Sequence, residues 1–361
     1  MYNIVFMKTT LIVDGNWLMM SRLFAVDKMF LIDNPEVQKE QGTRQLKDMM
    51  ARSINVILNR FGKSVNNIII VSDGGSWRKQ LPKPESMSSI KYKGNRVNKV
   101  EFDWEYIYKS LNELVDTSSN LGITAPHADG IEGDDWIWYW SRRLNQSGIN
   151  TIIWSSDNDL KQLIQLDNGA FTAWYNDRSG LFLPKELDDK VDEVDFFMHP
   201  ERSNYALDEL KKCCLEVSYI NPQDVVMSKI ICGDNSDNIK PVLRIQGDKK
   251  TINVTERDWQ SIKEDLNIFD LRGFFESAGK ILQKIVLIPK FRKFDGLKSI
   301  LEDNFEYNKK LVWLNEEVIP ESIIQRMAQE EYKEYDLSYI HSNYLILCGE
   351  DKSVEDIFEG I

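Results

Sequence analysis

The sequence predicts an α/β fold: a mostly parallel central sheet flanked by helices, with a smaller, mainly helical carboxyl-terminal region. Over about the first two-thirds of the chain, short apolar stretches of strand length alternate with helix-like stretches, as in parallel strands joined by helical crossovers. Three of the expected strands run directly into a segment that contains an aspartate. Beyond about residue 241 the pattern changes to longer helix-like stretches with little strand character.

The first two-thirds of the chain supplies the expected sheet. Strands are predicted at residues 9–13, 68–71 and 150–154, and helices at residues 44–59 and 134–144. The strands lead into Asp14, Ser72–Asp73 and Ser155–Asp157. Ligands of such sheets bind beyond the carboxyl ends of the strands. The sequence therefore predicts the functional site at this end of the sheet.

The second region begins near Pro241. We expect residues 1–240 to form the core and residues 241–361 to form the mainly helical region, which includes a long helix at residues 319–335. Within the core, Trp136 and Trp140 are four residues apart on one face of a predicted helix. That spacing favours packing in the core over contact with a ligand.

The bulk composition excludes several classes of protein. Of the 361 residues 42% are apolar and 28% charged, which is typical of a soluble globular protein. We see no apolar run that could cross a membrane and no export signal, and the four cysteines show neither metal-binding nor disulfide spacing. We therefore expect a cytoplasmic location. The net charge of −12 argues against a protein that coats nucleic acid, although it allows a local basic surface.

Acidic residues gather in five short segments, at residues 13–16, 72–75, 131–135, 156–159 and 233–238. Any one aspartate at a strand end is more simply explained as a turn or helix cap. Several carboxylates at one end of a sheet, however, repel one another unless cations lie between them. Such oxygen ligands suit Mg²⁺ or Mn²⁺, and two ions about 3.5–4 Å apart are the standard arrangement for phosphodiester hydrolysis. Zinc is not expected, because the three histidines are scattered.

Positive charge is concentrated at residues 77–99, which contain seven basic residues and a single acidic one. A run of charge is most often a solvated face. This run follows directly after a candidate metal ligand, on a protein whose net charge is negative, and we therefore interpret it as a phosphate-binding surface. Prolines and serines in its middle predict a loop.

The acidic and basic motifs together resemble a known family. Asp14-Gly15-Asn16, Asp73-Gly74-Gly75, Tyr92-Lys93-Gly94-Asn95-Arg96, Glu132-Gly133-Asp134-Asp135, Ser156-Asp157-Asn158-Asp159 and Gly233-Asp234-Asn235-Ser236-Asp237-Asn238 follow one another in this order. In that order they resemble the 5′-nuclease superfamily of flap endonucleases and 5′→3′ exonucleases, and they are most similar to its phage ribonuclease H branch. The resemblance covers about two-thirds of the chain and implies a PIN-like nuclease core.

The resemblance also implies roles for individual residues. One Mg²⁺ ion would be held by carboxylates of the first motifs, and a second, partly through water, by those of the later ones: Asp14, Asp73, Glu132 and Asp134, then Asp157, Asp159, Asp234 and Asp237. Mn²⁺ would substitute for Mg²⁺. Asp135 is equally an outer residue of the site or an acid at the helix start.

The basic segment would form an arch over the active site, through which a single-stranded 5′ end passes. Lys93 and Arg96 would be the catalytic cations next to the scissile phosphate, and Tyr92 would stack on a base or pack beneath the arch. The glycine-rich turn that binds a monovalent ion and the duplex in many relatives is absent after Asn238. The full set expected to contact nucleic acid is Arg78, Lys79, Lys91, Tyr92, Lys93, Arg96, Arg244, Lys249 and Lys250.

These features imply a metal-dependent 5′→3′ exonuclease and flap endonuclease that removes RNA primers during lagging-strand replication. The expected substrates are flap, nicked or RNA-primed duplexes. A single-stranded-DNA-binding protein or a sliding clamp is an expected partner of what we take to be a monomer. Two alternatives remain open: a single-strand ribonuclease of the PIN type, and a non-catalytic protein that binds branched DNA.

Overall fold

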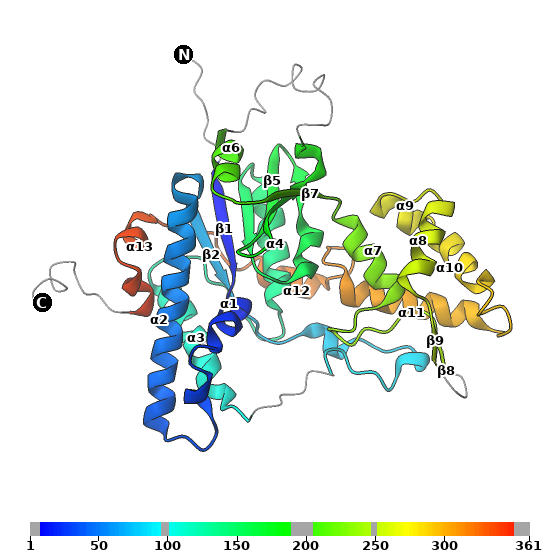
Figure 1. Ribbon diagram of the computed structural model, residues 1–361, viewed down its shortest axis with the longest axis horizontal. Helices are drawn as coiled ribbons and strands as arrows, with labels where there is room; N and C mark the ends of the chain where they lie inside the picture. Colours follow the sequence, from blue (N-terminus) through cyan, green and yellow to red (C-terminus); the bar gives the residue numbers. More distant parts are fainter. Residues whose placement is uncertain (1–7, 95–100, 189–204, 247–250, 350–361) are drawn as a thin grey trace, which may run out of the picture. The chain divides into compact units, whose positions relative to one another are not determined.

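The computed structural model describes residues 8–94, 101–188, 205–246 and 251–349 (Figure 1). Its contacts divide the chain into two compact units. The first unit comprises Met1–Gly75, Lys99–Ile220 and Ser322–Ile361, and the second comprises Ser76–Asn98 and Asn221–Glu321. Each unit has its own hydrophobic core.

The first unit is built on a seven-stranded sheet with the order β2-β1-β3-β5-β6-β7, in which β4 also pairs with β5. The pairs β1–β2, β1–β3, β3–β5 and β6–β7 are parallel, whereas β5 pairs antiparallel with β4 and β6. This mostly parallel sheet confirms the predicted fold class. The strands are β1 (Thr9–Asp14), β2 (Asn67–Val71), β3 (Asn150–Trp154), β4 (Gln165–Asp167), β5 (Ala170–Asn176), β6 (Gly180–Pro184) and β7 (Val217–Ile220).

Helices cover both faces of this sheet. Successive side chains of a strand point to opposite faces, and alternate residues such as Leu11 and Ile152 join the core formed with α1, α2 and α3. On the other face α4 contacts β1, β2, β3 and β5, and its Trp136 and Trp140 are fully buried, as predicted. The helices of the first unit up to β7 are α1 (Gly15–Leu23), α2 (Glu36–Phe61), α3 (Trp104–Asn120), α4 (Gly133–Gln146) and α6 (Tyr205–Lys212).

The long helix predicted at residues 319–335 is wrong, because α12 (Glu321–Met327) ends after seven residues. The backbone that follows it is held by side chains of the sheet unit. Asn67 donates to the carbonyl of Lys333 and accepts from the backbone N–H of Tyr335, while Thr124 accepts from the N–H of Lys333. These contacts override the helical periodicity, and the chain continues through α13 (Ser338–Ser342) and the 3₁₀ helix η8 (Tyr344–Cys348).

The second unit is mainly helical. It contains α7 (Gln223–Cys232), α8 (Glu256–Asp265), α9 (Leu271–Glu276), α10 (Ala278–Leu287) and α11 (Leu297–Val312), with a short hairpin of β8 (Arg244–Gln246) and β9 (Thr251–Asn253). Asn304 and Asn308 of α11 are buried and donate to the carbonyls of Val242, Ile230 and Lys240. These bonds satisfy carbonyls near the end of α7 and in the irregular backbone that follows it.

This division differs from the expected boundary at residue 240. Residues 221–240 share a core with α8, α10 and α11, and residues 322–349 pack with the sheet unit through Leu337, Ile340 and Leu347. The basic segment also falls in the second unit. Among the helices that the structure describes, none has the length and apolar character of a membrane span.

Candidate active site at the carboxyl end of the sheet

Asp14 is the last residue of β1 and caps the start of α1. One carboxylate oxygen accepts from the backbone N–H of Trp17 at 2.9 Å, and the other accepts from the Ser155 hydroxyl at 2.7 Å. The pKa of Asp14 is raised to about 7: burial is the largest cause, the carboxylates of Asp73 and Asp157 add to it, and the two hydrogen bonds act in the opposite direction. The ends of β1, β2 and β3 thus bring together three acids that repel one another.

Asp73 follows β2 and links it to the neighbouring elements. Its backbone N–H donates to the side-chain oxygen of Asn16 at 2.8 Å, and its Oδ1 accepts from the N–H of Gly133 at 2.6 Å. At Gly74 the backbone passes close to the segment that precedes α4, and only glycine fits there, since a Cβ would lie 1.9 Å from the carbonyl oxygen of Ala128. Asp73 is thereby fixed at the start of α4.

The start of α4 carries three further acids. Glu132 is the N-cap and is 5% exposed, Asp134 is half-buried, and Asp135 is completely buried. The Asp135 carboxylate accepts from the backbone N–H of Glu132 at 3.3 Å. Asp135 therefore serves as an acid at the helix start, one of the two roles that the sequence left open.

Asp157 and Asp159 lie at the start of the 3₁₀ helix η5 (Asn158–Leu163). Asp157 is exposed and accepts from the backbone N–H of Asp159 at 2.8 Å. Its own N–H donates to the Ser155 hydroxyl at 3.0 Å. Because that hydroxyl also donates to Asp14, Ser155 connects the two acids directly.

The other two predicted metal ligands, Asp234 and Asp237, belong to the second unit. They lie in a turn that starts at Gly233, where a Cβ would lie 2.5 Å from the carbonyl oxygen of Ile239. Burial raises the pKa of Asp234, but hydrogen bonds from Lys229 and Ser236 outweigh it and leave the pKa below its ordinary value. Asp234 is thus an ionised acid that already has a cationic partner.

The end of the basic segment is attached to this same turn. The backbone N–H of Lys93 donates to the carbonyl of Asp237 at 2.8 Å, and Asn238 donates to the carbonyl of Lys91 at 2.8 Å. The Lys93 ammonium lies 3.9 Å from the Asp237 carboxylate, and the Tyr92 hydroxyl donates to that carboxylate at 3.4 Å. Within the second unit, Lys93 is therefore held at a defined position, in a backbone conformation with φ of +54°.

The remaining residues expected to contact nucleic acid are more dispersed. Lys79, Lys91 and Arg244 are exposed. The guanidinium of Arg78 lies over the Trp77 ring, 4.5 Å from its centroid, and Arg78 is buried. Arg96, Lys249 and Lys250 lie outside the described residues.

The acids of the first unit have the chemistry of a site for hard cations. Their oxygens suit Mg²⁺ or Mn²⁺, and a cation at this end of the sheet would favour the ionised form of Asp14, which burial and the neighbouring acids disfavour. Within the described residues, no three acidic, histidine or cysteine side chains are already grouped closely enough to bind one ion. The chemical type of the donors fits the expected metal, whereas the assignment of individual ligands stays a prediction.

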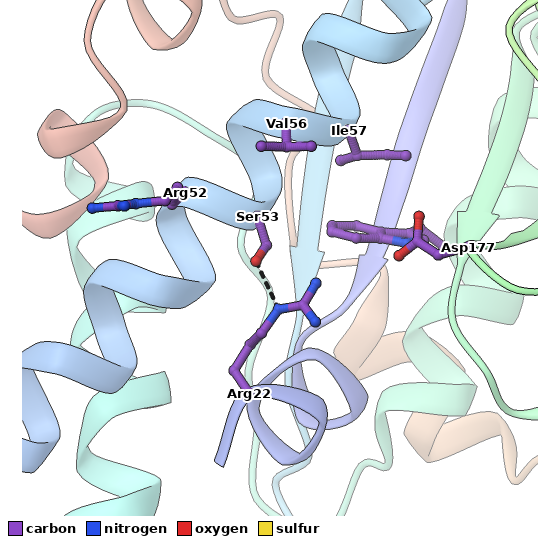
Figure 2. A pocket seen from close by; sticks show the side chains of 7 residues that line it. Arg22, Arg52, Ser53, Val56, Ile57 and Asp177 are labelled. Atoms are coloured by element: carbon purple, nitrogen blue, oxygen red, sulfur yellow. Dashed lines mark hydrogen bonds between the residues drawn. The ribbon is translucent and has the colours of Figure 1, made fainter. Parts of the chain in front are cut away.

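A small hollow lies next to the end of β3. It has a volume of about 200 Å³ and is lined by Arg22, Arg52, Ser53, Val56, Ile57, Trp154 and Asp177. The Nε of Arg22 donates to the Ser53 hydroxyl at 2.7 Å, and Arg52 points away from both residues (Figure 2). Arg22, which follows the first acidic motif, thus lines a hollow beside the end of β3, and its guanidinium is held there by Ser53.

Asn16 and Ser155 are the residues of this site that the sequence did not identify. Both act by accepting or donating hydrogen bonds between segments that are far apart in the chain. Their only signal was their position within or beside acidic motifs, since Asn16 follows Asp14-Gly15 and Ser155 precedes Ser156-Asp157.

Comparisons with known proteins define the class to which this site belongs. The model of the family described as "5'-3' exonuclease, N-terminal resolvase-like domain" matches residues 9–192, just over half of the chain. The chain therefore belongs to the 5′-3′ exonuclease family of the 5′-nuclease superfamily. This confirms the resemblance drawn from the acidic motifs, all but the last of which lie within or overlap the matched residues.

Particular relatives carry the same name. A 5′-3′ exonuclease of Mycoplasma pneumoniae (strain ATCC 29342 / M129 / Subtype 1) is 28% identical over 186 residues, which are 51% of this chain and 53% of the relative. A 5′-3′ exonuclease of Mycoplasmopsis pulmonis (strain UAB CTIP) is 28% identical over 257 residues, which are 70% of this chain and 66% of the relative. The matches thus span between about half and two-thirds of the length of these relatives.

A solved structure supports the fold over nearly the whole chain. A bacteriophage T5 flap endonuclease, in a pseudo-enzyme–product complex with DNA and metal ions, matches with a TM-score of 0.52 at 14% identity. The match covers 92% of this chain and 99% of the T5 protein. At this level of identity the likeness is one of fold.

Proposed function

We propose that the protein is a metal-dependent 5′→3′ exonuclease and flap endonuclease that hydrolyses RNA–DNA and DNA–DNA duplexes and removes RNA primers in lagging-strand replication. The observation that carries this proposal is that Asp14, Asp73 and Asp157 follow three neighbouring parallel strands, and that burial, together with the charges of Asp73 and Asp157, raises the pKa of Asp14. Family membership and the DNA and metal ions bound by the T5 neighbour support the same chemistry.

In this proposal the acids hold two Mg²⁺ ions: Asp14, Asp73, Glu132 and Asp134 the first, and Asp157, Asp159, Asp234 and Asp237 the second. The bound ions would supply an activated water and offset the charge of the phosphate. The protein itself holds the carboxylate oxygens in place. Ser155 and the N–H of Trp17 fix both oxygens of Asp14, and the N–H of Gly133 fixes one oxygen of Asp73.

Lys93 and Arg96 are proposed to stabilise the charge that develops on the phosphate. The Lys93→Met variant should lower kcat by about 10²-fold, the loss typical when one such stabilising group is removed. KM should change less, because other cations of the basic segment contribute to binding. Single-turnover and steady-state cleavage of the same flap substrate measure the two effects.

The matched control for Lys93 is Lys280→Met, which removes an exposed lysine of α10 in the same unit. Its kcat should stay within about twofold of the wild type, as expected for substitution of an exposed residue that has no proposed role. Equal losses in the two variants would show that Lys93 acts only through general charge.

The proposed activity is tested by incubating a 5′-end-labelled flap, a nicked RNA–DNA duplex and free single-stranded RNA with the protein, in Mg²⁺ and in EDTA. We expect labelled 5′ products from the first two substrates in Mg²⁺ and none in EDTA. Preferential cleavage of free RNA would instead indicate a single-strand ribonuclease. Tight binding of the flap without cleavage in Mg²⁺ or Mn²⁺ would indicate a non-catalytic branch-binding protein.

A further inference from the structure

We propose that Trp174 and Asn176 of β5 are positioning residues for the active site, because they hold the loop that carries Asp157. This inference rests on the proposed function, in which Asp157 is a metal ligand. Neither residue touches the reacting groups. Each acts on the backbone of the loop, and the loop in turn places the carboxylate.

Three successive residues of β5 hold the loop that follows β3. The indole N–H of Trp174 donates to the carbonyl oxygen of Asp157 at 3.1 Å. The side-chain amide of Asn176 donates to the carbonyl oxygen of Ser155 at 3.3 Å, and the carbonyl of Tyr175 accepts from the N–H of Ser155 at 3.2 Å. Beyond the last paired residue of β3, the backbone is thus fixed at both Ser155 and Asp157.

Fixing this loop also fixes its link to Asp14. The Ser155 hydroxyl donates to Asp14 at 2.7 Å and accepts from the N–H of Asp157 at 3.0 Å. A shift of the loop would therefore move Asp157 and weaken the bond to Asp14 together. Two of the proposed ligands depend on one short stretch of backbone.

Trp174 is itself held firmly. It is 1% exposed, and its ring meets Phe182 edge to face with centroids 5.2 Å apart. The ammonium of Lys161 lies 4.4 Å from the Trp174 centroid and 3.8 Å from that of Phe182. The indole cannot turn without breaking these contacts, so its N–H is a fixed donor.

The bond from Trp174 sets it apart from other buried tryptophans. Among the described residues, the indole N–H groups of Trp136, Trp140 and Trp154 are buried without a hydrogen-bond acceptor. Tryptophan in this core is therefore used for its apolar surface at those positions, and for a directed hydrogen bond at Trp174. Residues that orient metal ligands affect metal affinity although they do not touch the ion.

The test compares Trp174→Phe with Trp140→Phe. Both variants keep an aromatic ring in the core and lose an indole N–H, but only the first loses a hydrogen bond. We expect Trp174→Phe to bind Mn²⁺ about tenfold more weakly than the wild type in a calorimetric titration, the lower end of the usual effect of such residues. Excess Mn²⁺ should restore most of its cleavage rate. Trp140→Phe should bind Mn²⁺ like the wild type.

Asn176→Asp provides a second test if Trp174→Phe folds poorly. The substitution keeps the oxygen that accepts from the N–H groups of Arg178 and Ser179, and removes the donor to Ser155. An added carboxylate would by itself attract Mn²⁺, so weaker binding would reveal the loss of positioning. We expect weaker binding.

Wild-type Mn²⁺ affinity in both Trp174→Phe and Asn176→Asp would overturn the positioning role while leaving the proposed function standing. A wild-type protein that neither binds Mn²⁺ nor cleaves the flap would overturn both. The inference would also be contradicted if Trp140→Phe lost as much Mn²⁺ affinity as Trp174→Phe. The effect would then come from a general loss of packing in the core.

Discussion

Replacing Asp73 or Asp157 by asparagine is expected to reduce cleavage of a 5′ flap by about 10²–10³-fold or more, by analogy with the removal of one charge-stabilising group in other enzymes. The fold should survive. In both positions the oxygen that accepts a backbone hydrogen bond, from Gly133 or from Asp159, is retained by the amide. Only the negative charge is lost. Cleavage rates in Mg²⁺ and thermal unfolding in EDTA measure the two properties separately.

Asp116→Asn is the matched control, since it removes an exposed aspartate of α3 in the same unit. It should leave the cleavage rate within about twofold of the wild type. Full activity in Asp73→Asn and Asp157→Asn would show that these acids are turn and helix caps and nothing more. Unfolding of the variants would likewise contradict the separation of charge from structure.

In the absence of metal, the difference in stability between the wild type and Asp14→Asn should depend strongly on pH. The pKa of Asp14 is raised from 3.8 to about 7, with burial as the main cause. Between these values the folded protein holds a proton that the unfolded chain has released, so the free energy of unfolding falls as pH rises and levels off above about 7. The full difference is on the order of 4 kcal/mol.

Denaturant unfolding in EDTA at pH 5 and pH 8, for the wild type and for Asp14→Asn, measures this difference. Relative to the variant, the wild type should lose stability between the two values. Because asparagine does not titrate, subtraction removes the contributions of groups that do not interact with Asp14 and leaves those of Asp14 and its acidic neighbours. Identical pH profiles would mean that burial and the acidic neighbours do not raise the pKa of Asp14. Mg²⁺ should reduce the effect, since a bound cation stabilises the ionised form.

The sheet could be predicted well because its strands are continuous apolar runs. Buried parallel strands give that pattern, and the expected strand at residues 150–154 coincides with β3. The prediction of a helix at residues 319–335 was wrong because contacts distant in sequence decide the structure there. The helical periodicity is local, whereas Asn67 and Thr124, distant in sequence, bind the backbone of Lys333 and Tyr335. The hairpin of β8 and β9 was also missed, as its strands are only three residues long.

The acids of the candidate site could be proposed from the sequence because strand ends and motif order constrain their positions, and their role as metal ligands stays a prediction. What could not be predicted is which partner each side chain chooses. Asp135 accepts from the N–H of Glu132, and the guanidinium of Arg78 lies over the ring of Trp77. Trp174 donates to the carbonyl of Asp157, 17 residues away in sequence. Such choices depend on distances of a few ångströms between segments that only the folded chain brings together. The boundary of the second unit depends on the same kind of contact.

The proposed metal site at the carboxyl end of the sheet is tested most directly by anomalous diffraction from crystals of the wild-type protein grown or soaked with Mn²⁺. We expect anomalous peaks within bonding distance, about 2.0–2.5 Å, of carboxylate oxygens from the ends of β1, β2 and β3 and the start of α4. Asp14 and Asp157 are expected among the ligands. Well-ordered crystals that bind Mn²⁺ only elsewhere, with Asp14 and Asp157 facing solvent or one another, would contradict the assignment of this end of the sheet as the metal-dependent active site.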